Sequence, residues 1–306
     1  MKAMRYPAYG DSDVLAYEET GEPVAGAGQV VVRVAGTGFN MLDVAIRLGI
    51  LRDAMPIRFP HTPNVDVSGV ISAVGDGVTG WSVGDAVVAF LPATEPGAAA
   101  EYVVVPAKIL AAAPRSGELA DAAALPVAGL TAWQALFEYA ELTAGQTVLV
   151  NGAGGGVGGF AVQLAKRAGA TVTATASRRS QDRVRSYGAD EVVDYTATPV
   201  LEAVAGRRFD IVLQLVRASA EETAQLAELV ADGGVFVSTT TPGPDHVRTR
   251  NVMVRSDAAQ LTDLVGLVDR GELVVDVVDR RPLTDLAAVH DAAAAGKLTG
   301  KTVLTP

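Results

Sequence analysis

The apolar positions of the first 110 residues fall in short runs rich in β-branched side chains, and Gly, Pro and Asp separate these runs. Clear examples are residues 30–34, 69–74 and 86–90. Short apolar runs bounded by turn-forming residues are typical of strands joined by tight connections. This part of the chain therefore predicts a compact, mostly antiparallel β domain.

The pattern changes at about Leu119, where helical stretches begin to alternate with apolar strands. After a helical stretch that reaches about Glu141, we expect strands at 147–150, 171–176, 191–195, 209–213 and 234–238. Such alternation implies a parallel sheet with crossover helices. The last fifty residues return to the earlier character, with a helix at 258–270 and short strands near Val274 and at 302–304. We therefore assign residues 1–118 with 255–306 to one domain and residues 119–254 to another.

Composition narrows the chemistry that the chain can perform. Among 306 residues there is no cysteine, which excludes disulfides, thiolate nucleophiles, iron–sulfur clusters and zinc sites with sulfur ligands. The net charge of −10 would repel a phosphate backbone, so we expect no nucleic-acid partner. No apolar run approaches the roughly 18–20 residues of a membrane span, and we expect a cytoplasmic protein without a membrane partner.

The strand at 147–150 leads into a glycine cluster, Asn151–Gly158, and then into a helix. This is the context of a dinucleotide-binding fingerprint, in which glycines let the backbone approach a pyrophosphate at the helix N-terminus. The alternative is a glycine-rich turn without a ligand. Since six of these eight residues are Gly or Ala, which is more than a turn requires, we favour a bound dinucleotide.

The choice between NAD and NADP depends on the residues that follow the next strand. An acidic side chain there would bind the 2′-hydroxyl of NAD, but none occurs between Gly159 and Gln181. The strand at 171–176 ends instead in Ser177, Arg178 and Arg179. Guanidinium groups match phosphate oxygens, so this pattern favours NADPH. The alternative is a solvated loop with incidental arginines.

At this point the chain resembles the zinc-independent quinone oxidoreductases of the medium-chain dehydrogenase/reductase superfamily, the zeta-crystallin-like group. Four segments carry the resemblance: Ala100–Pro106 (AEYVVVP), Ala123–Trp133 (AALPVAGLTAW), Ala144–Val150 (AGQTVLV) and Gly300–Leu304 (GKTVL). The resemblance implies an α/β protein with a doubly wound parallel Rossmann sheet and a GroES-like, mostly antiparallel β domain. It also implies an active site in the cleft between these domains.

The resemblance further implies a set of cofactor-binding residues. Residues 155–158 would meet the pyrophosphate, and the Ser-Arg-Arg run the 2′-phosphate. Tyr195 would lie near the adenosine, the residues after the fourth and fifth Rossmann strands near the nicotinamide half, and Lys301 near the phosphates. The alternatives are that Leu215 is a core residue and Lys301 a surface charge. The full predicted set is Gly155, Gly156, Val157, Gly158, Ser177, Arg178, Arg179, Tyr195, Leu215, Thr239, Thr241 and Lys301.

Several departures from the family pattern concern the expected catalytic domain. Asn40 stands where zinc-dependent relatives have cysteine, and residues 63–66 replace their Gly-His-Glu run, so we expect no metal. The segment 39–49 resembles the family's Asn-Pro-x-Asp and Arg-x-Gly-x-Tyr pattern, but Met41 replaces the proline, and Ile50 or Leu51 replaces the tyrosine. Because the phenol of that tyrosine is missing, we expect a more apolar pocket. Gln214 also replaces a common aspartate after the fourth Rossmann strand.

Without metal, hydrogen bonds must stabilise the charge that develops on an acceptor. We expect the Asn40 amide, and secondarily the Thr131 hydroxyl, to orient the nicotinamide or the acceptor; a helix cap and a buried, backbone-bonded threonine are the alternatives. The predicted function is NADPH-dependent reduction of a small-molecule electron acceptor, a quinone or an α,β-unsaturated carbonyl. An enoyl-thioester or biosynthetic tailoring reductase and a non-catalytic NADPH-binding sensor or structural protein are alternatives.

Two further expectations concern the surface. We expect His61, His246 and His290 to lie on it, because none has a spacing that suggests catalysis. By analogy with relatives we expect a homo-oligomer, with residues 235–238 as a sheet edge that could join the subunits.

Overall fold

The computed structural model describes residues 1–306, and the chain divides into two compact units. Unit 1 comprises Met1–Val127 and Ser256–Pro306, and unit 2 comprises Ala128–Arg255. We had assigned residues 119–127 to the second domain, but they belong to unit 1. Their short 3-10 helix, Ala120–Ala124, packs so closely on the sheet of unit 1 that a Cβ on Gly36 or Gly38 would lie 2.4 Å from a carbonyl oxygen of that helix.

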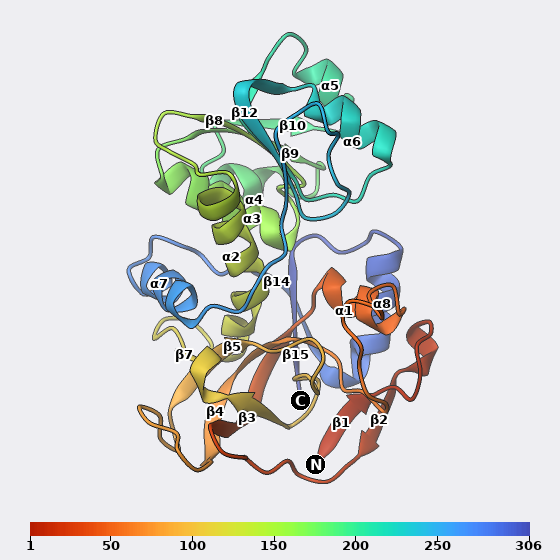
Figure 1. The fold of residues 1–306 in the computed structure, drawn as a ribbon, viewed down its shortest axis with the longest axis vertical. Coiled ribbons are helices and arrows are strands. Elements are labelled where there is room, and N and C mark those ends of the chain that lie inside the picture. Colours follow the sequence, from red (N-terminus) through yellow and green to blue (C-terminus); the bar gives the residue numbers. More distant parts are fainter. The chain divides into compact units, whose positions relative to one another are not determined.

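Unit 1 is built on a seven-stranded sheet with the order β14-β15-β3-β4-β5-β7, in which β6 also pairs with β3 (Figure 1). All pairs are antiparallel except β14 with β15. The strands are β3 (Gln29–Gly38), β4 (Asp66–Val74), β5 (Ala86–Phe90), β6 (Tyr102–Pro106), β7 (Ala111–Ala112), β14 (Val277–Pro282) and β15 (Lys301–Thr305), with β1 (Lys2–Arg5) and β2 (Ala16–Glu19) as a separate pair. The mostly antiparallel β unit predicted from the sequence is confirmed. The strand that we predicted near Val274 begins instead at Val277.

Three helices accompany this sheet: α1 (Met41–Arg47), α7 (Ala258–Asp269) and α8 (Leu286–Ala294). Helices α1 and α8 lie side by side (Figure 1), where Arg47 Nε donates to His290 Nδ1 over 3.2 Å. An apolar cluster that includes Phe39, Leu286 and Leu304 draws the two chain ends into one core. The C-terminal strand is thereby fixed beside the residues that precede α1.

Unit 2 is a six-stranded parallel sheet with the order β10-β9-β8-β11-β12-β13 (Figure 1). The strands are β8 (Thr147–Asn151), β9 (Thr171–Ala176), β10 (Glu191–Asp194), β11 (Phe209–Gln214), β12 (Val230–Ser238) and β13 (Thr249–Asn251). The helices are α2 (Pro126–Trp133) with a π-helical continuation at Gln134–Tyr139, α3 (Gly156–Arg167), α4 (Gln181–Ser186), α5 (Val200–Ala203) and α6 (Ala220–Ala227). In chain order the strands run 3-2-1-4-5-6, which is the doubly wound Rossmann arrangement that we predicted.

One detail of this sheet corrects an expectation. Residues 235–238 belong to β12, which pairs with β13 through Phe236, Val237 and Ser238 and is therefore not an edge strand. The short strand β13 is the edge on that side. A subunit contact through this side of the sheet would have to use β13.

Candidate functional site

The glycine cluster forms the turn between β8 and α3. Gly155 is the N-cap residue of α3 in an extended conformation, and its N–H donates to Gly152 O over 3.1 Å. The next three residues, Gly156, Val157 and Gly158, have N–H groups without an acceptor in the protein. The first turn of a helix leaves such N–H groups free to bind an anion, and the helix dipole favours negative charge there. The site fits the pyrophosphate of a dinucleotide.

Two of the glycines are required by packing. A Cβ at Gly158 would lie 2.3 Å from Gly152 O and 2.5 Å from Ala153 Cα, and one at Gly154 would lie 2.4 Å from Ser180 Oγ. At Gly155 the nearest atom to such a Cβ is Gly152 O at 3.4 Å, which is an ordinary contact. Gly155 is exposed. Packing does not require a glycine at position 155. The missing side chain instead leaves the turn accessible to a ligand.

The turn after β9 places basic side chains beside the glycine turn. Arg178 and Arg179 are exposed, Ser177 is half-buried, and no acidic residue lies between α3 and Gln181. Arg183 on α4, which the sequence did not indicate, donates from Nη2 to Gly154 O over 2.9 Å. A side chain that spans from one helix to the turn of another gives no local sequence signal. Arg183 ties α4 to the glycine turn, and the exposed arginines lie close to it in the chain.

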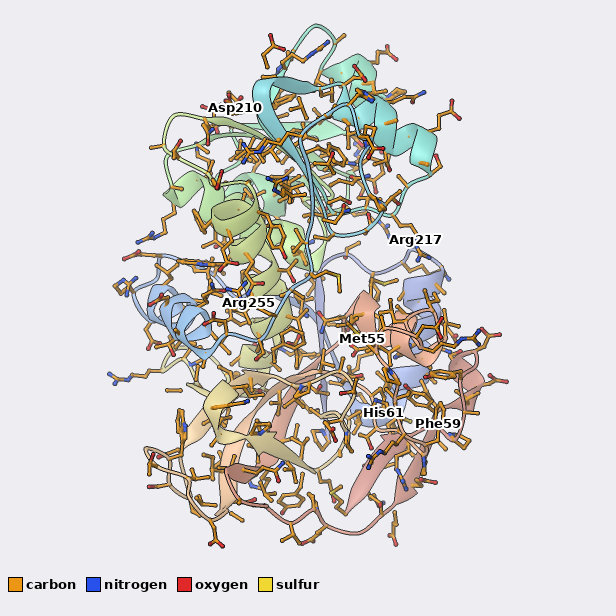
Figure 2. The ribbon with its side chains drawn as sticks, in the orientation of Figure 1. Met55, Phe59, His61, Asp210, Arg217 and Arg255 are labelled. Carbon is orange, nitrogen blue, oxygen red and sulfur yellow. The ribbon has the colours of Figure 1, made fainter.

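The remaining predicted cofactor residues of unit 2 lie at or after the carboxyl ends of neighbouring strands. Tyr195 follows β10 and is 51% exposed, and Leu215 follows β11 directly. Thr239 and Thr241 follow β12; the Thr239 N–H donates to Gln214 O over 3.1 Å, and the Thr241 hydroxyl donates to Ala218 O over 2.7 Å. In Figure 2 this edge of the sheet can be located from Arg217, which lies in the loop after β11. Asp210 is labelled near the other end of the same strand.

A chain of polar side chains that the sequence did not indicate crosses three strands beneath the glycine turn; Thr175 and Gln214 are buried, and Asn151 is half-buried. Gly152 N–H donates to Thr175 Oγ1 over 2.9 Å, and that hydroxyl donates to Asn151 Oδ1 over 2.7 Å. Asn151 Nδ2 in turn donates to Gln214 Oε1 over 2.6 Å. Because these residues end or nearly end β9, β8 and β11, the chain links the carboxyl ends of the three central strands.

Unit 1 contains a buried charged cluster that includes one predicted catalytic residue. Asn40, which precedes α1, donates from Nδ2 to Asp66 Oδ2 over 2.8 Å and accepts from Lys301 Nζ over 2.8 Å. Lys301 Nζ also lies 3.3 Å from Asp66 Oδ2 and 3.2 Å from Phe39 O. Asp43 closes the cluster by accepting the Asn40 N–H over 2.8 Å. Strands β4 and β15 and the start of α1 are thus held together by polar contacts.

Burial controls the ionisation of both carboxyl groups in this cluster. It raises the pKa of Asp43 to about 7, a rise that the backbone N–H groups of Asn40 and Val65 partly oppose. Burial also raises the pKa of Asp66, opposed by the charge of Lys301 and by hydrogen bonds from Asn40 and Val127. Two buried carboxylates beside one ammonium would leave an uncompensated negative charge. Protonation of Asp43 at neutral pH or below removes that imbalance.

These contacts change the role of Lys301 that we expected from the resemblance. Its side chain is 4% exposed, and its three ammonium protons have three acceptors within unit 1. Lys301 therefore belongs to the cluster around Asn40 rather than to a phosphate site. The other predicted catalytic residue, Thr131, is buried in α2 at 6% exposure.

Two of the three histidines predicted to be on the surface are buried, which corrects that expectation. His61 is 4% exposed and packs edge-on against the ring of Tyr6, and Figure 2 shows it beside Phe59. His290 is 1% exposed and packs against Phe39. Burial lowers the pKa of His61 to about 4, and burial with the charge of Arg47 lowers the pKa of His290 to about 3. Both imidazoles are neutral core side chains, whereas His246 is exposed.

The apolar residues that replace the usual pocket positions are accessible. Met41 is 61% exposed at the start of α1, and Ile50 is 54% exposed just after that helix.

No group of three or more His, Asp or Glu side chains is placed to hold a metal ion. None of the helices is long and apolar enough to cross a membrane.

Family models match most of the chain. The model described as "Alcohol dehydrogenase GroES-like domain" matches residues 26–115, and the one described as "Zinc-binding dehydrogenase" matches residues 187–304. Among curated proteins, a chloroplast envelope quinone oxidoreductase homolog of Arabidopsis thaliana is 34% identical, with 100% of this chain and 98% of the relative covered. The shared length and identity are enough to establish common family membership.

Solved structures agree with this relationship. A quinone oxidoreductase from Coxiella burnetii aligns with a TM-score of 0.91 at 27% identity, covering 100% of this chain and 99% of the other. A mycobacterial protein solved in complex with NADPH aligns with a TM-score of 0.87 at 27% identity, covering 100% of both chains. Both alignments extend over the two units.

Proposed function

Since the chain belongs to the quinone oxidoreductase group of the medium-chain dehydrogenase/reductase superfamily, and is an oxidoreductase dependent on a nicotinamide dinucleotide, we propose that it uses NADPH to reduce a quinone or an α,β-unsaturated carbonyl. The turn after β9 carries the choice of cofactor. It offers the Ser177 hydroxyl and the guanidinium groups of Arg178 and Arg179, and no carboxylate. Paired guanidinium groups bind phosphate oxygens in a fork geometry that a ribose hydroxyl does not need.

The acceptor class is supported by the groups that unit 1 offers. When bound, NADPH supplies a hydride, which is two electrons and one proton, and a second proton from solvent or a side chain completes reduction of the acceptor. Unit 1 presents the Asn40 amide and the exposed apolar side chains of Met41 and Ile50. A hydrogen bond gives weak assistance, which suits an acceptor whose conjugation already spreads the developing negative charge.

Asn40 has one N–H that a bound acceptor could take. Its contact with Asp66 is short, whereas that with Gly38 O is 3.4 Å long and correspondingly weak. Lys301, on the carbonyl side, fixes which end of the amide carries the N–H groups. We propose that Asn40 orients the nicotinamide or the acceptor, with Asp66 and Lys301 holding its amide in one orientation.

The function is tested with purified protein, NADPH and a panel of quinones, enals and enones, with loss of nicotinamide absorbance as the readout. Turnover of at least one conjugated acceptor is expected. The panel also contains enoyl thioesters, and turnover of these alone would move the assignment to an enoyl-thioester reductase. NADPH binding without turnover of any acceptor would favour a non-catalytic sensor or structural role.

The cofactor assignment predicts the behaviour of the double variant Arg178→Ala/Arg179→Ala. Because the lost guanidinium groups bind only the 2′-phosphate, KM for NADPH should rise about 10- to 100-fold, while KM for NADH changes little, as expected for roughly 1.4–3 kcal/mol of lost charge-assisted bonding. The exposed pair Arg270→Ala with Arg250→Ala, outside this turn in the sequence, is the control. Equal effects on both cofactors would contradict the 2′-phosphate assignment.

A further inference from the structure

The polar chain beneath the glycine turn has a fixed direction. A backbone N–H can only donate, so the bond from Gly152 makes Thr175 Oγ1 an acceptor and leaves its hydroxyl proton for Asn151 Oδ1. The Asn151 amide must then present its N–H₂ group to the next residue. That group donates to Gln214 Oε1, over 2.6 Å. The direction set at Gly152 therefore determines which end of the Gln214 amide is left over.

The remaining end of Gln214 is an N–H₂ donor. Gln214 is 1% exposed, and Nε2 has no hydrogen-bond partner within the protein. It is the last residue of β11, at the carboxyl edge of the sheet. The loop that follows closely approaches the glycine turn, since a Cβ built on Gly152 would lie 2.7 Å from Val216 Cγ2 and 3.3 Å from Leu215 Cβ. Unlike the fully buried unpaired atoms of the protein, such as Asn64 Nδ2, Nε2 keeps some exposed surface, so a ligand oxygen can reach this donor.

The strand order indicates which part of a dinucleotide lies over this donor. The free N–H groups of α3 mark the pyrophosphate position after β8, and the arginine turn after β9 marks the adenosine side. In the sheet, β11 neighbours β8 on the side opposite β9. A dinucleotide that extends from β9 across β8 must therefore continue over the end of β11 with its nicotinamide half.

We propose that Gln214 is a cofactor-binding residue whose amide N–H₂ group donates to an oxygen of the nicotinamide half of the dinucleotide, either a ribose hydroxyl oxygen or the carboxamide carbonyl. Thr175 and Asn151 act as positioning residues, because they fix the direction of the Gln214 amide. The inference rests on the proposed use of NADPH and adds a contact on the side of the cofactor away from the arginine turn.

The test compares two variants with three ligands. Gln214→Glu keeps an oxygen for Asn151 but replaces the N–H₂ donor by an oxygen, and Gln214→Met removes the donor without adding charge. Dissociation constants are measured for NADPH, for 2′,5′-ADP, and for the phosphoadenosine diphosphoribose that lacks nicotinamide. Gln146→Glu is the matched control: it lies just before β8, at the opposite edge of the same sheet, and its Oε1 accepts a hydrogen bond too, from the Thr143 backbone N–H.

Both Gln214 variants should bind NADPH about tenfold more weakly at pH 8, the cost of one lost hydrogen bond, and should bind 2′,5′-ADP within about threefold of wild type. The ligand without nicotinamide separates the two possible oxygens: it loses affinity if the ribose is the acceptor and does not if the carboxamide is. For Gln214→Glu, NADPH affinity should recover as the pH falls, because a protonated carboxyl group donates again. Gln214→Met and Gln146→Glu should show no such recovery.

Unchanged NADPH affinity in both folded Gln214 variants would overturn the inference. So would an equal loss for NADPH and 2′,5′-ADP without recovery at low pH, because that pattern indicates a purely structural role. If Gln214→Met does not fold, Gln214→Glu decides the question alone, since it preserves the Asn151 contact. A wild-type chain that binds no NADPH would instead overturn the proposed function on which the inference rests.

Discussion

At the scale of single residues, the cluster around Lys301 shows how a buried charge is made tolerable. The side chains of Lys301 and Asp66 are 4% and 0% exposed. Lys301 Nζ contacts Asp66 Oδ2 and donates to Asn40 Oδ1, and Asn40 Nδ2 donates to Asp66 Oδ2. Such a pair contributes little net stability relative to an apolar core, but removal of one partner leaves the other charge buried and unpaired. The pair therefore fixes the start of β4 beside the start of β15, and it adds little stability compared with apolar residues at the same positions.

Lys301→Met should consequently lower the free energy of unfolding by about 3–5 kcal/mol, because Asp66 loses its cationic partner and Asn40 Oδ1 loses its donor. The double variant with Asp66→Asn should recover part of this loss, since no unpaired charge remains. Urea unfolding gives both values. Lys166→Met is the control, because the Lys166–Asp190 ion pair is partly exposed and should contribute at most about 1 kcal/mol. Equal losses for Lys301→Met and Lys166→Met would contradict the role of the cluster.

The two buried histidines predict acid sensitivity. Their folded-state pKa values, about 4 and about 3, lie below the roughly 6.5 of an unfolded histidine. The unfolded chain therefore binds more protons between these values, and the free energy of unfolding falls as the pH falls from about 7. At pH 5 the loss should be on the order of 2 kcal/mol for each histidine. The raised pKa of Asp43, about 7, acts in the opposite direction over the same window.

His290→Asn isolates one of these contributions, because its Oδ1 can still accept from Arg47 but does not titrate. The variant should lose about 2 kcal/mol less than wild type between pH 7 and pH 5, whatever the cost of its smaller side chain at pH 7. Urea unfolding at the two pH values measures the difference. His246→Asn, at an exposed position, should leave the pH dependence unchanged. An unchanged slope in His290→Asn would show that His290 is not buried in its neutral form.

At the scale of elements, the strand–turn–helix around the glycine cluster is the part that the sequence predicts best. The apolar strand, the glycines and the amphipathic α3 are all local signals, and Gly158 is constrained by its close neighbours Gly152 and Ala153. What escaped prediction depends on distant residues. Arg183, Gln214 and β13 acquire their roles from pairing between separate elements, and such pairing leaves no periodic pattern in the chain.

Two alanine substitutions within this turn should separate folding from binding. Gly158→Ala places a Cβ 2.3 Å from Gly152 O and should destabilise the protein by about 1–3 kcal/mol, the usual cost of overpacking. Gly155→Ala meets only an ordinary contact and should fold normally, but its methyl group stands where the pyrophosphate approaches, so NADPH binding should weaken. Thermal unfolding and NADPH titration give the two readouts. Normal NADPH affinity in Gly155→Ala would argue against a pyrophosphate at this turn.

At the scale of the whole molecule, the two units differ in how they are built from the chain. Unit 2 is one continuous segment, whereas unit 1 needs both chain ends, because β15 lies between β14 and β3 in its sheet. The sequence predicted this division through the change of pattern at Leu119 and the family resemblance. It could not predict the boundary at Val127, because the chain passes from one unit to the other inside the continuous helix α2.

The continuity of unit 2 predicts that residues 126–255, which include all of α2, fold alone and bind NADPH. The segment contains the complete parallel sheet and its own apolar core around Leu149, Val212 and Phe236. The glycine turn, the arginine turn and Gln214 all lie within it, so its dissociation constant for NADPH should be within about tenfold of the full-length value, or ~1.4 kcal/mol. It should reduce no acceptor, because Asn40 is absent. Arg178→Ala/Arg179→Ala in the same segment is the control that should weaken binding. A segment that unfolds cooperatively yet binds no NADPH would mean that unit 1 supplies part of the cofactor site.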